Sequence, residues 1–384
     1  MASTDHPHRN SQGKRGAMKM ISRLILAALI AVCGVTVAPA GPAFATVPGH
    51  VLSSTTASLP PTLSAIADGK RIHYLTTDIN GAPITATGLV LTPKTGKTNR
   101  VVAWGHGTTG LADICAPSTN QAVFWEEARI AVAELLSRGW TVAAPDYPGL
   151  GTPQPHPYLV GASAARSLID NVRAARQLDA ALSTQYAVDG HSQGGSAALW
   201  ASQIAPAYDG SLVLRGTASI APLSNADLLA PEIPGTAAQG YLVMALYGIA
   251  AVDNSFHPFS VLAAPAEAKV GVLQTGCLYE ILAAYQPLTA KQLVNGGVVP
   301  ASVTNRFRTY INPGRTSPSA PVLIVHGTAD EAVPYFLSAD LLVPQLEADY
   351  DIPVQFETIE GGTHDSAVIE SADLVADWIA ARFT

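Results

Sequence analysis

Residues 186–200 read Tyr186-Ala187-Val188-Asp189-Gly190-His191-Ser192-Gln193-Gly194-Gly195-Ser196-Ala197-Ala198-Leu199-Trp200, a short apolar run followed by Gly-x-Ser-x-Gly and then by helix-forming residues. This order predicts a strand, a sharp turn that carries Ser192, and a helix, which is the arrangement of a nucleophile elbow. Gly190 and Gly194 flank the serine because such a turn packs backbone against backbone and leaves no room for a Cβ. The helix would point its first amides at an oxyanion formed at Ser192.

A serine hydroxyl is a weak nucleophile, so Ser192 needs a base, and the base needs an acid that orients it. With this type of elbow the chain order is Ser, then Asp or Glu, then His. Asp330 follows an apolar run that ends at His326, and His364 follows the last apolar run of the chain. Ser192, Asp330 and His364 are therefore the candidate catalytic residues, each placed after a predicted strand.

The sequence leaves other roles open for these residues. Ser192 could be a small residue in a packing turn, Asp330 could cap the next helix, and His364 could be a surface loop residue. Glu331 is the main rival for the acid role. The remaining histidines near or after the elbow are expected to be structural or to support the site: His191, His257 and His326.

A tetrahedral intermediate also needs amide donors. The amide of Gln193, directly after the candidate nucleophile, is the first. Asp146, which follows a predicted strand, is one candidate for the second. The alternative is the loop Gly105-His106-Gly107-Thr108-Thr109-Gly110, in which Gly107 or Thr108 could donate.

The same glycine run also matches G-x-G-x-x-G, the pattern of a dinucleotide-binding loop. That pattern should open a helix directly and be followed about 20 residues later by an acidic residue. Residues 111–120 include Cys115 and Pro117, and no acid ends a second strand at that distance, so a dehydrogenase is disfavoured. H-E-x-x-H, zinc-type Cys/His and Walker patterns are absent from the sequence, so we expect no cofactor and no metal.

The N-terminal segment has the form of a secretory signal peptide. Basic residues precede an uncharged apolar run from Leu24, and Ala43-Phe44-Ala45 provides an A-x-A cleavage site. Pro39, Pro42 and the short apolar core disfavour a membrane-spanning helix, although a retained anchor stays open as an alternative. Residues 1–45 are therefore expected to be removed, and the mature protein is expected to be extracellular.

Charge and cysteine content fit this compartment. Removal of residues 1–45 takes away five of the 22 basic residues and one of the 29 acidic residues, which leaves a formal net charge of −11. An acidic chain without a basic stripe is a poor candidate for nucleic acid or for anionic membrane surfaces. Cys115 and Cys277 remain, and in an extracellular protein we expect them to pair, with two separate thiols as the alternative.

Apolar strand-like runs alternate with helical patterns along most of the chain. Strands are predicted at residues 71–78, 84–91, 100–104, 140–144, 212–220, 321–326 and 354–360, and helices at residues 121–137, 161–178, 335–348 and 366–381. This alternation predicts an α/β fold with a mostly parallel central sheet and helices on both faces. Residues 223–318 lack strand alternation and are predicted to be a helical insertion, which leaves residues 46–222 and 319–384 as the core.

These motifs together resemble the secretory lipase family of α/β-hydrolases, the group that includes fungal lipase A. The likeness extends roughly from the Gly105 loop to the last helix. It is carried by Ile114-Cys115-Ala116-Pro117-Ser118, Arg138-Gly139-Trp140-Thr141-Val142, Asp146-Tyr147-Pro148-Gly149, Asp189-Gly190-His191-Ser192-Gln193-Gly194-Gly195, Gly276-Cys277-Leu278, the segment from His326 to Tyr335, and His364.

The resemblance implies that the three candidate residues form a catalytic triad and that Asp146 takes the second oxyanion position. It implies a disulfide between Cys115 and Cys277 that joins the core to a helical cap. The cap would be the segment at residues 223–318, which would form the acyl-chain pocket and act as a lid. This chain departs from many members by carrying Gln193 where they have glycine, and it lacks the cysteines for the second disulfide of some members.

The sequence therefore predicts a secreted serine hydrolase that cleaves carboxylic esters through an acyl-enzyme. It would be a lipase or esterase acting on acyl-chain esters such as acylglycerols. A secreted peptidase or amidase is the first alternative, and a catalytically inactive binding protein on the same fold is the second. We expect a monomer that binds small-molecule or lipid esters, makes transient contact with lipid interfaces and does not bind nucleic acid.

Overall fold

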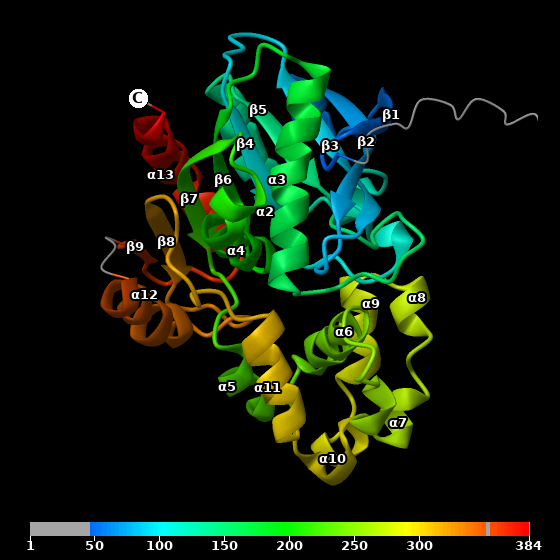
Figure 1. The fold of residues 1–384 in the computed structure, drawn as a ribbon. Coiled ribbons are helices and arrows are strands. Elements are labelled where there is room, and N and C mark those ends of the chain that lie inside the picture. The colour runs from blue at the N-terminus through cyan, green and yellow to red at the C-terminus, as the bar shows by residue number, and fades with distance from the viewer. Residues whose placement is uncertain (1–46, 351–353, 384) are drawn as a thin grey trace, which may run out of the picture. The chain divides into compact units, whose positions relative to one another are not determined.

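The computed structural model describes residues 47–350 and 354–383, and the predicted signal peptide at residues 1–45 lies outside them. The described chain builds one sheet of nine strands in the order β1-β2-β3-β5-β4-β6-β7-β8-β9 (Figure 1). The strands are β1 (Val51–Thr56), β2 (Ala67–Thr77), β3 (Pro83–Pro93), β4 (Val101–Gly105), β5 (Thr141–Pro145), β6 (Gln185–His191), β7 (Val213–Ile220), β8 (Val322–Gly327) and β9 (Val354–Ile359). From β5 to β9 the neighbours run parallel, which confirms the predicted mostly parallel sheet.

Helices cover both faces of this sheet because side chains of a strand alternate between the faces. In β4, Val101 and Ala103 pack with α3 (Gly161–Leu178) and α4 (Gln193–Tyr208), whereas Val102 and Trp104 pack with α2 (Glu126–Ser137) and α13 (Ser366–Arg382). The remaining helices of this part of the chain are α1 (Pro61–Ser64), a π-helical segment at Leu337–Leu342 and α12 (Val343–Tyr350).

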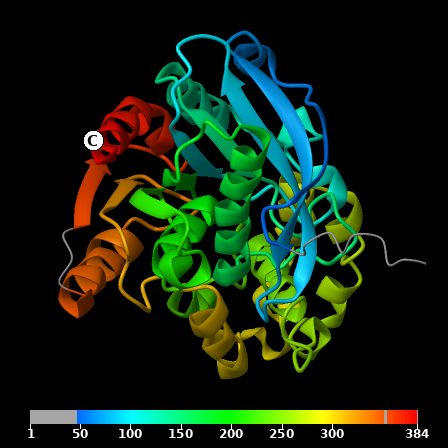
Figure 2. The same ribbon diagram turned by 45° about the horizontal axis from the view of Figure 1, so that its top comes forward.

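Antiparallel strands extend one edge of the sheet. β2 and β3 form the hairpin predicted around Asn80-Gly81, and β1 pairs with β2 beyond it. The blue hairpin and the orange β8–β9 pair lie at opposite edges of the sheet in both views (Figure 2). β1 was not predicted, because five of its six residues are exposed and its polar sequence VLSSTT carries no apolar alternation.

Most predicted elements agree with the structure to within a few residues, and the exceptions have local causes. The helix predicted from residue 121 begins only at Glu126, since Trp125 before it is extended, with φ −57° and ψ 159°. Residues Gln121–Val123 form a separate short 3₁₀ turn. Gly139, with φ +78°, ends the α2 segment as predicted, because the left-handed conformation is easily adopted only by glycine.

Between β7 and β8 the chain forms helices that have their own apolar cluster, drawn in green to yellow below the sheet in Figure 1. They are α5 (Ala226–Leu229), α6 (Gln239–Ala250), α7 (Ala264–Glu267), α8 (Val272–Thr275), α9 (Leu278–Tyr285), α10 (Ala290–Leu293) and α11 (Ala301–Tyr310). A backbone bridge between Gly110 and Cys277 connects this segment to the loop after β4. Among the described helices none is long and apolar enough to cross a membrane.

Candidate active site

Ser192 occupies the sharp turn between β6 and α4 with a strained backbone. Its φ of 57° and ψ of −115° lie outside the regions that non-glycine residues normally adopt, and such strain persists only where the surroundings hold it. The Ser192 amide donates to the carbonyl of Ile220 at 2.9 Å, which anchors the turn to the end of β7. No hydrogen bond of the Ser192 hydroxyl is recorded among the described residues, so the oxygen is open to the adjoining cavities.

Two glycines around Ser192 are required by close backbone packing. A Cβ on Gly190 would lie 2.4 Å from the carbonyl oxygen of Gly194, and a Cβ on Gly194 would lie 1.9 Å from that of Gly105. No side chain tolerates such distances against backbone atoms. The elbow is therefore pressed against the end of β4, which brings the loop after β4 next to Ser192.

Asp330 and His364 meet across the loops that follow β8 and β9. Nδ1 of His364 donates to Oδ2 of Asp330 at 2.7 Å, while the amides of Ala332 and Val333 both donate to Oδ1 at 2.8 Å. Burial opposes ionisation of Asp330, but the hydrogen bonds from His326 and His364 outweigh it and hold the pKa of the carboxyl below its usual range. Asp330, not its neighbour Glu331, is thus the carboxylate that contacts the imidazole.

Two buried histidines support this pair. Nε2 of His326 lies 3.1 Å from Oδ2 of Asp330 and 2.9 Å from the carbonyl of Val333, so this nitrogen carries a proton and its Nδ1 accepts from Ser338. Nε2 of His191 donates to the carbonyl of His364 at 3.1 Å, and burial lowers the pKa of His191 well below its ordinary value. Both histidines hold the loops in place, in agreement with the supporting role expected from the sequence.

The two candidate positions for the second oxyanion donor differ in where their amides lie. The Asp146 amide donates to the carbonyl of Thr87 at 2.8 Å, and the carboxylate accepts from Thr87 Oγ1 and from the Ser118 amide. Asp146 lines neither cavity that reaches Ser192. A Cβ on Gly107, in contrast, would be 3.7 Å from Cβ of Ser192, and Thr108 lines both cavities.

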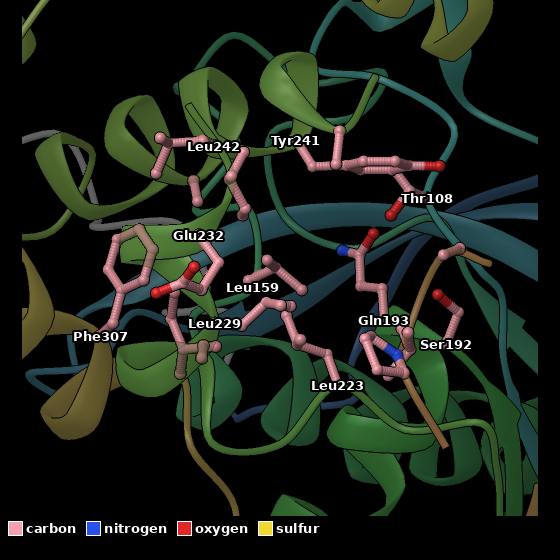
Figure 3. A pocket seen from close by; sticks show the side chains of 18 of the residues that line it. Thr108, Leu159, Ser192, Gln193, Leu223, Leu229, Glu232, Tyr241, Leu242 and Phe307 are labelled. Atoms are coloured by element: carbon pink, nitrogen blue, oxygen red, sulfur yellow. The ribbon is translucent and has the colours of Figure 1, made fainter. Parts of the chain in front are cut away.

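An apolar cavity of about 330 Å³ leads away from Ser192 (Figure 3). Ser192, Gln193 and Thr108 lie at one end, and Phe307 and the exposed Glu232 lie toward the other. Between them stand the aliphatic side chains of Leu159, Leu223, Leu229 and Leu242. Pockets of this size and lining suit an apolar ligand with a few polar groups at one end.

A second cavity of about 390 Å³ also reaches Ser192, and His364 lines this one rather than the apolar cavity. Ser192 is thus the point where the two cavities meet. The nucleophile, base and acid candidates come from the ends of β6, β9 and β8, where the carboxyl ends of parallel strands converge.

Comparison with known proteins places the chain in a family: a model of the secretory lipase family matches residues 97–384. The chain belongs to the secretory lipase family. It is 26% identical over 363 residues to a secreted triacylglycerol lipase of Malassezia globosa, and the alignment covers 88% of this chain and 76% of the Malassezia lipase. It is 28% identical over 273 residues to lipase 7 of Candida albicans, covering 67% of this chain and 60% of the relative.

Solved structures share the fold of this secretory lipase. The closed state of Candida antarctica lipase A aligns with a TM-score of 0.73 and 19% identity, over 88% of this chain and 82% of that one. A rice cell wall degrading esterase of Xanthomonas oryzae aligns with a TM-score of 0.70 and 22% identity, over 88% of this chain and 99% of the esterase. The family assignment predicted from the sequence is therefore confirmed, and with it the class of carboxylic ester hydrolases.

Gln193, directly after the candidate nucleophile, directs its side chain to a buried histidine. Nδ1 of His156 lies 2.7 Å from the carbonyl of Pro148, and burial lowers the pKa of His156 to about 4, so the ring is neutral with its proton on Nδ1. Its Nε2 then accepts from Nε2 of Gln193 at 3.5 Å. Gln193 keeps its backbone amide at the first turn of α4, where amides have no partner within the helix.

The predicted disulfide is present, with Cys115 and Cys277 bonded and their Cα atoms 5.5 Å apart. One group of described residues has the geometry to hold a metal ion: ligand atoms of His191, His364 and Asp365 lie within 4.8 Å of one another. Two of its members are already engaged, His364 with Asp330 and His191 with the His364 carbonyl. The sequence did not indicate three further residues at the site. His156 contacts Gln193, the Tyr158 hydroxyl lies 2.7 Å from Oγ1 of Thr108, and Glu127 lines the second cavity.

Proposed function

We propose that this chain is a secreted lipase or esterase that cleaves acyl-chain esters, such as acylglycerols, through an acyl-enzyme on Ser192. The observation that carries the proposal is the hydrogen bond from His364 to Asp330, with His364 lining the same cavity as the strained Ser192. The apolar cavity on the other side of Ser192 suits an acyl chain. The signal peptide at residues 1–45, extracellular location, monomeric state and brief contact with lipid interfaces belong to the same proposal.

In the first step Ser192 Oγ attacks the ester carbonyl while Nε2 of His364 takes the hydroxyl proton. Asp330 holds the proton on Nδ1 of His364 and stabilises the imidazolium that forms. The carbonyl oxygen becomes an oxyanion, which the amides of Gln193 and Thr108 bind in our proposal. Thr108 is preferred to Asp146 because the Asp146 amide is already hydrogen-bonded to Thr87.

Collapse of the tetrahedral intermediate breaks the bond to the alcohol, whose oxygen takes the proton from His364. Water then attacks the acyl-enzyme with His364 again as base, and the free acid leaves with Ser192 regenerated. The helical segment at residues 223–318 acts as a cap in this scheme, because it supplies most of the apolar lining, including Leu229 of α5, Leu242 of α6 and Phe307 of α11. Residues 46–222 and 319–384 form the hydrolase core that carries the triad.

A substrate panel tests this proposal against its two rivals. p-Nitrophenyl esters from acetyl to hexadecanoyl are compared with peptide p-nitroanilides, using wild-type protein and Ser192→Ala. We expect hydrolysis of the esters, a preference for medium or long chains, and loss of activity in the variant. Cleavage of the anilides with little ester turnover would support a peptidase, and no turnover of either substrate would support a binding protein.

A further inference from the structure

The second cavity at Ser192 differs in chemistry from the apolar one. Its walls come from the start of α2, the start of α9, α6 and the His364 loop. The residues that give it this character are Trp125, Glu127, Tyr241, Tyr279, Glu331 and Asp365. It is therefore lined by aromatic rings and carboxylates.

The carboxylates of this cavity have no lysine or arginine side chain beside them in the described part of its lining. Glu127, Glu331 and Asp365 all line the cavity, whereas no lysine or arginine is among the described residues that line it. The side chain of Arg129, two residues after Glu127 on α2, donates hydrogen bonds to the carbonyls of Phe124 and Gln121 at 2.6 and 2.9 Å. The cavity is consequently a region of negative potential next to His364.

Glu127 is the least compensated of these acids. It is only 6% exposed, and among the described residues no side chain donates a hydrogen bond to its carboxylate. Burial, with a further contribution from Asp365, raises the pKa of Glu127 to about 7. Its own backbone amide and the charge of Arg129 offset only part of the cost of this burial, so a cation in the cavity would be stabilised by the carboxylate.

Aromatic rings stand beside these acids. The rings of Trp125 and Tyr279 meet edge to face with centroids 5.3 Å apart, and Nε1 of Trp125 donates to the carbonyl of Thr108 at 3.2 Å, which fixes the indole. Tyr279 is 62% exposed and lies at the start of α9, whereas Tyr241 is largely buried. Aromatic faces combined with carboxylates form the type of site that binds quaternary ammonium groups.

The mechanism fixes which part of an ester enters this cavity. His364 delivers a proton to the departing alcohol oxygen, and His364, Thr363 and Asp365 line the second cavity but not the apolar one. The acyl chain therefore lies along the apolar cavity and the alcohol lies in the acidic one. This orientation depends on the function proposed above.

We propose that the second cavity is an alcohol subsite that favours cationic alcohols of the ammonium type over neutral or anionic ones. The reaction is unchanged: the ester bond breaks, Ser192 is acylated, and the amino alcohol leaves with the proton from His364. The cation lies between the rings of Trp125 and Tyr279 and the carboxylates of Glu127 and Asp365.

The test compares two esters of the same acid that differ in one atom type. Butanoylcholine carries a trimethylammonium group, and 3,3-dimethylbutyl butanoate carries a neutral tert-butyl group of the same shape. We expect kcat/KM for the choline ester to exceed that for the neutral ester by about tenfold at low salt, a ratio in the range of a cation–π contact reinforced by carboxylates. The 3-sulfopropyl ester, which is anionic, should be the poorest of the three.

Variants assign the preference to the cavity. In Glu127→Gln and in the surface variant Asp365→Asn, the ratio of kcat/KM for the choline ester over the neutral ester should fall to about threefold or less. The control is Glu126→Gln, because Glu126 is an exposed acid on the same helix and lies outside both cavities. This control should keep the wild-type ratio. Equal kcat/KM for the two wild-type esters, or a ratio unaffected in both cavity variants, would overturn the inference while leaving ester hydrolysis intact. Absence of turnover of every ester would instead refute the proposed function.

Discussion

Nδ1 of His364 lies 2.7 Å from Oδ2 of Asp330, and this contact joins the loops after β9 and β8. The hydrogen bond places the imidazole proton on Nδ1 and leaves Nε2 as the basic nitrogen. Oδ2 of Asp330 also accepts from His326, while two backbone amides hold Oδ1. The carboxylate is thus fixed on both oxygens before any substrate binds.

Asp330→Asn should lower kcat by about 10³- to 10⁴-fold, because an amide at this position favours the wrong tautomer of His364. Glu331→Gln should lose less than about tenfold, since the imidazole of His364 is hydrogen-bonded to Asp330 whereas Glu331 lines the cavities. Steady-state kinetics on a short-chain p-nitrophenyl ester measures both. A larger loss in Glu331→Gln than in Asp330→Asn would exchange the roles of the two acids.

Asp146→Asn should reduce stability more than catalysis. The Asp146 carboxylate accepts hydrogen bonds from Thr87 Oγ1 at 2.6 Å and from the Ser118 amide at 2.8 Å, and an asparagine side chain can accept at only one of these positions. We expect a lower Tm with kcat within about tenfold of wild type, because asparagine keeps the backbone amide and loses only a side-chain hydrogen bond. An unchanged Tm would show that these carboxylate hydrogen bonds do not stabilise the fold.

Ala245→Phe should shift substrate preference toward short acyl chains. Ala245 lies on α6 and lines the apolar cavity, so a phenyl ring there takes up space needed by a long chain. Each methylene that can no longer be buried costs about 0.8 kcal/mol, so the ratio of kcat/KM for decanoyl over butanoyl esters should fall by at least about tenfold. An unchanged ratio in a folded variant would mean that the acyl chain does not enter this cavity.

Asp189→Asn should flatten the pH dependence of stability. Asp189 lies in β6, is 1% exposed and has no hydrogen-bond partner for Oδ1 among the described residues, and burial raises its pKa to about 7. The carboxyl of Asp189 releases its proton near pH 4 in the unfolded chain, so the folded state binds more protons between about pH 4 and pH 7. The folded protein therefore loses stability as the pH rises through that window, by at most about 1.4 kcal/mol per pH unit.

The variant carries no charge at residue 189 and so lacks this loss. Its Tm should match wild type near about pH 4 and exceed it near about pH 8. Thermal unfolding followed by circular dichroism over this range measures the difference. Parallel Tm curves for the two proteins would show that Asp189 does not titrate in the folded state as described.

The sequence was sufficient to predict the strand ends that carry Ser192, Asp330 and His364, because apolar runs mark the strands and parallel strands bring their carboxyl ends together. It left open whether Asp146 or the loop with Gly107 and Thr108 lies nearer Ser192. The position at a strand end was right, but pairing of β5 with the antiparallel β3 engages the Asp146 amide with Thr87, and that pairing is not visible in the local sequence.

Contacts between distant segments account for the other omissions. Glu127 has the sequence context of an ordinary residue in the first turn of a helix, and its position beside His364 and Asp365 depends on how α2 packs against α13. The direction of the Gln193 side chain likewise depends on His156, which lies in a loop with no regular pattern. Such placements follow from tertiary packing rather than from local preference.

The central claim is that Ser192 is the nucleophile of an ester hydrolase. Labelling with a fluorophosphonate, followed by mass spectrometry of the peptide that contains Ser192, tests it most directly. We predict one equivalent of adduct on Ser192 with parallel loss of ester hydrolysis, and neither adduct nor hydrolysis in folded Ser192→Ala. An adduct on another residue, or a Ser192→Ala protein that is labelled and hydrolyses esters like wild type, would contradict the account.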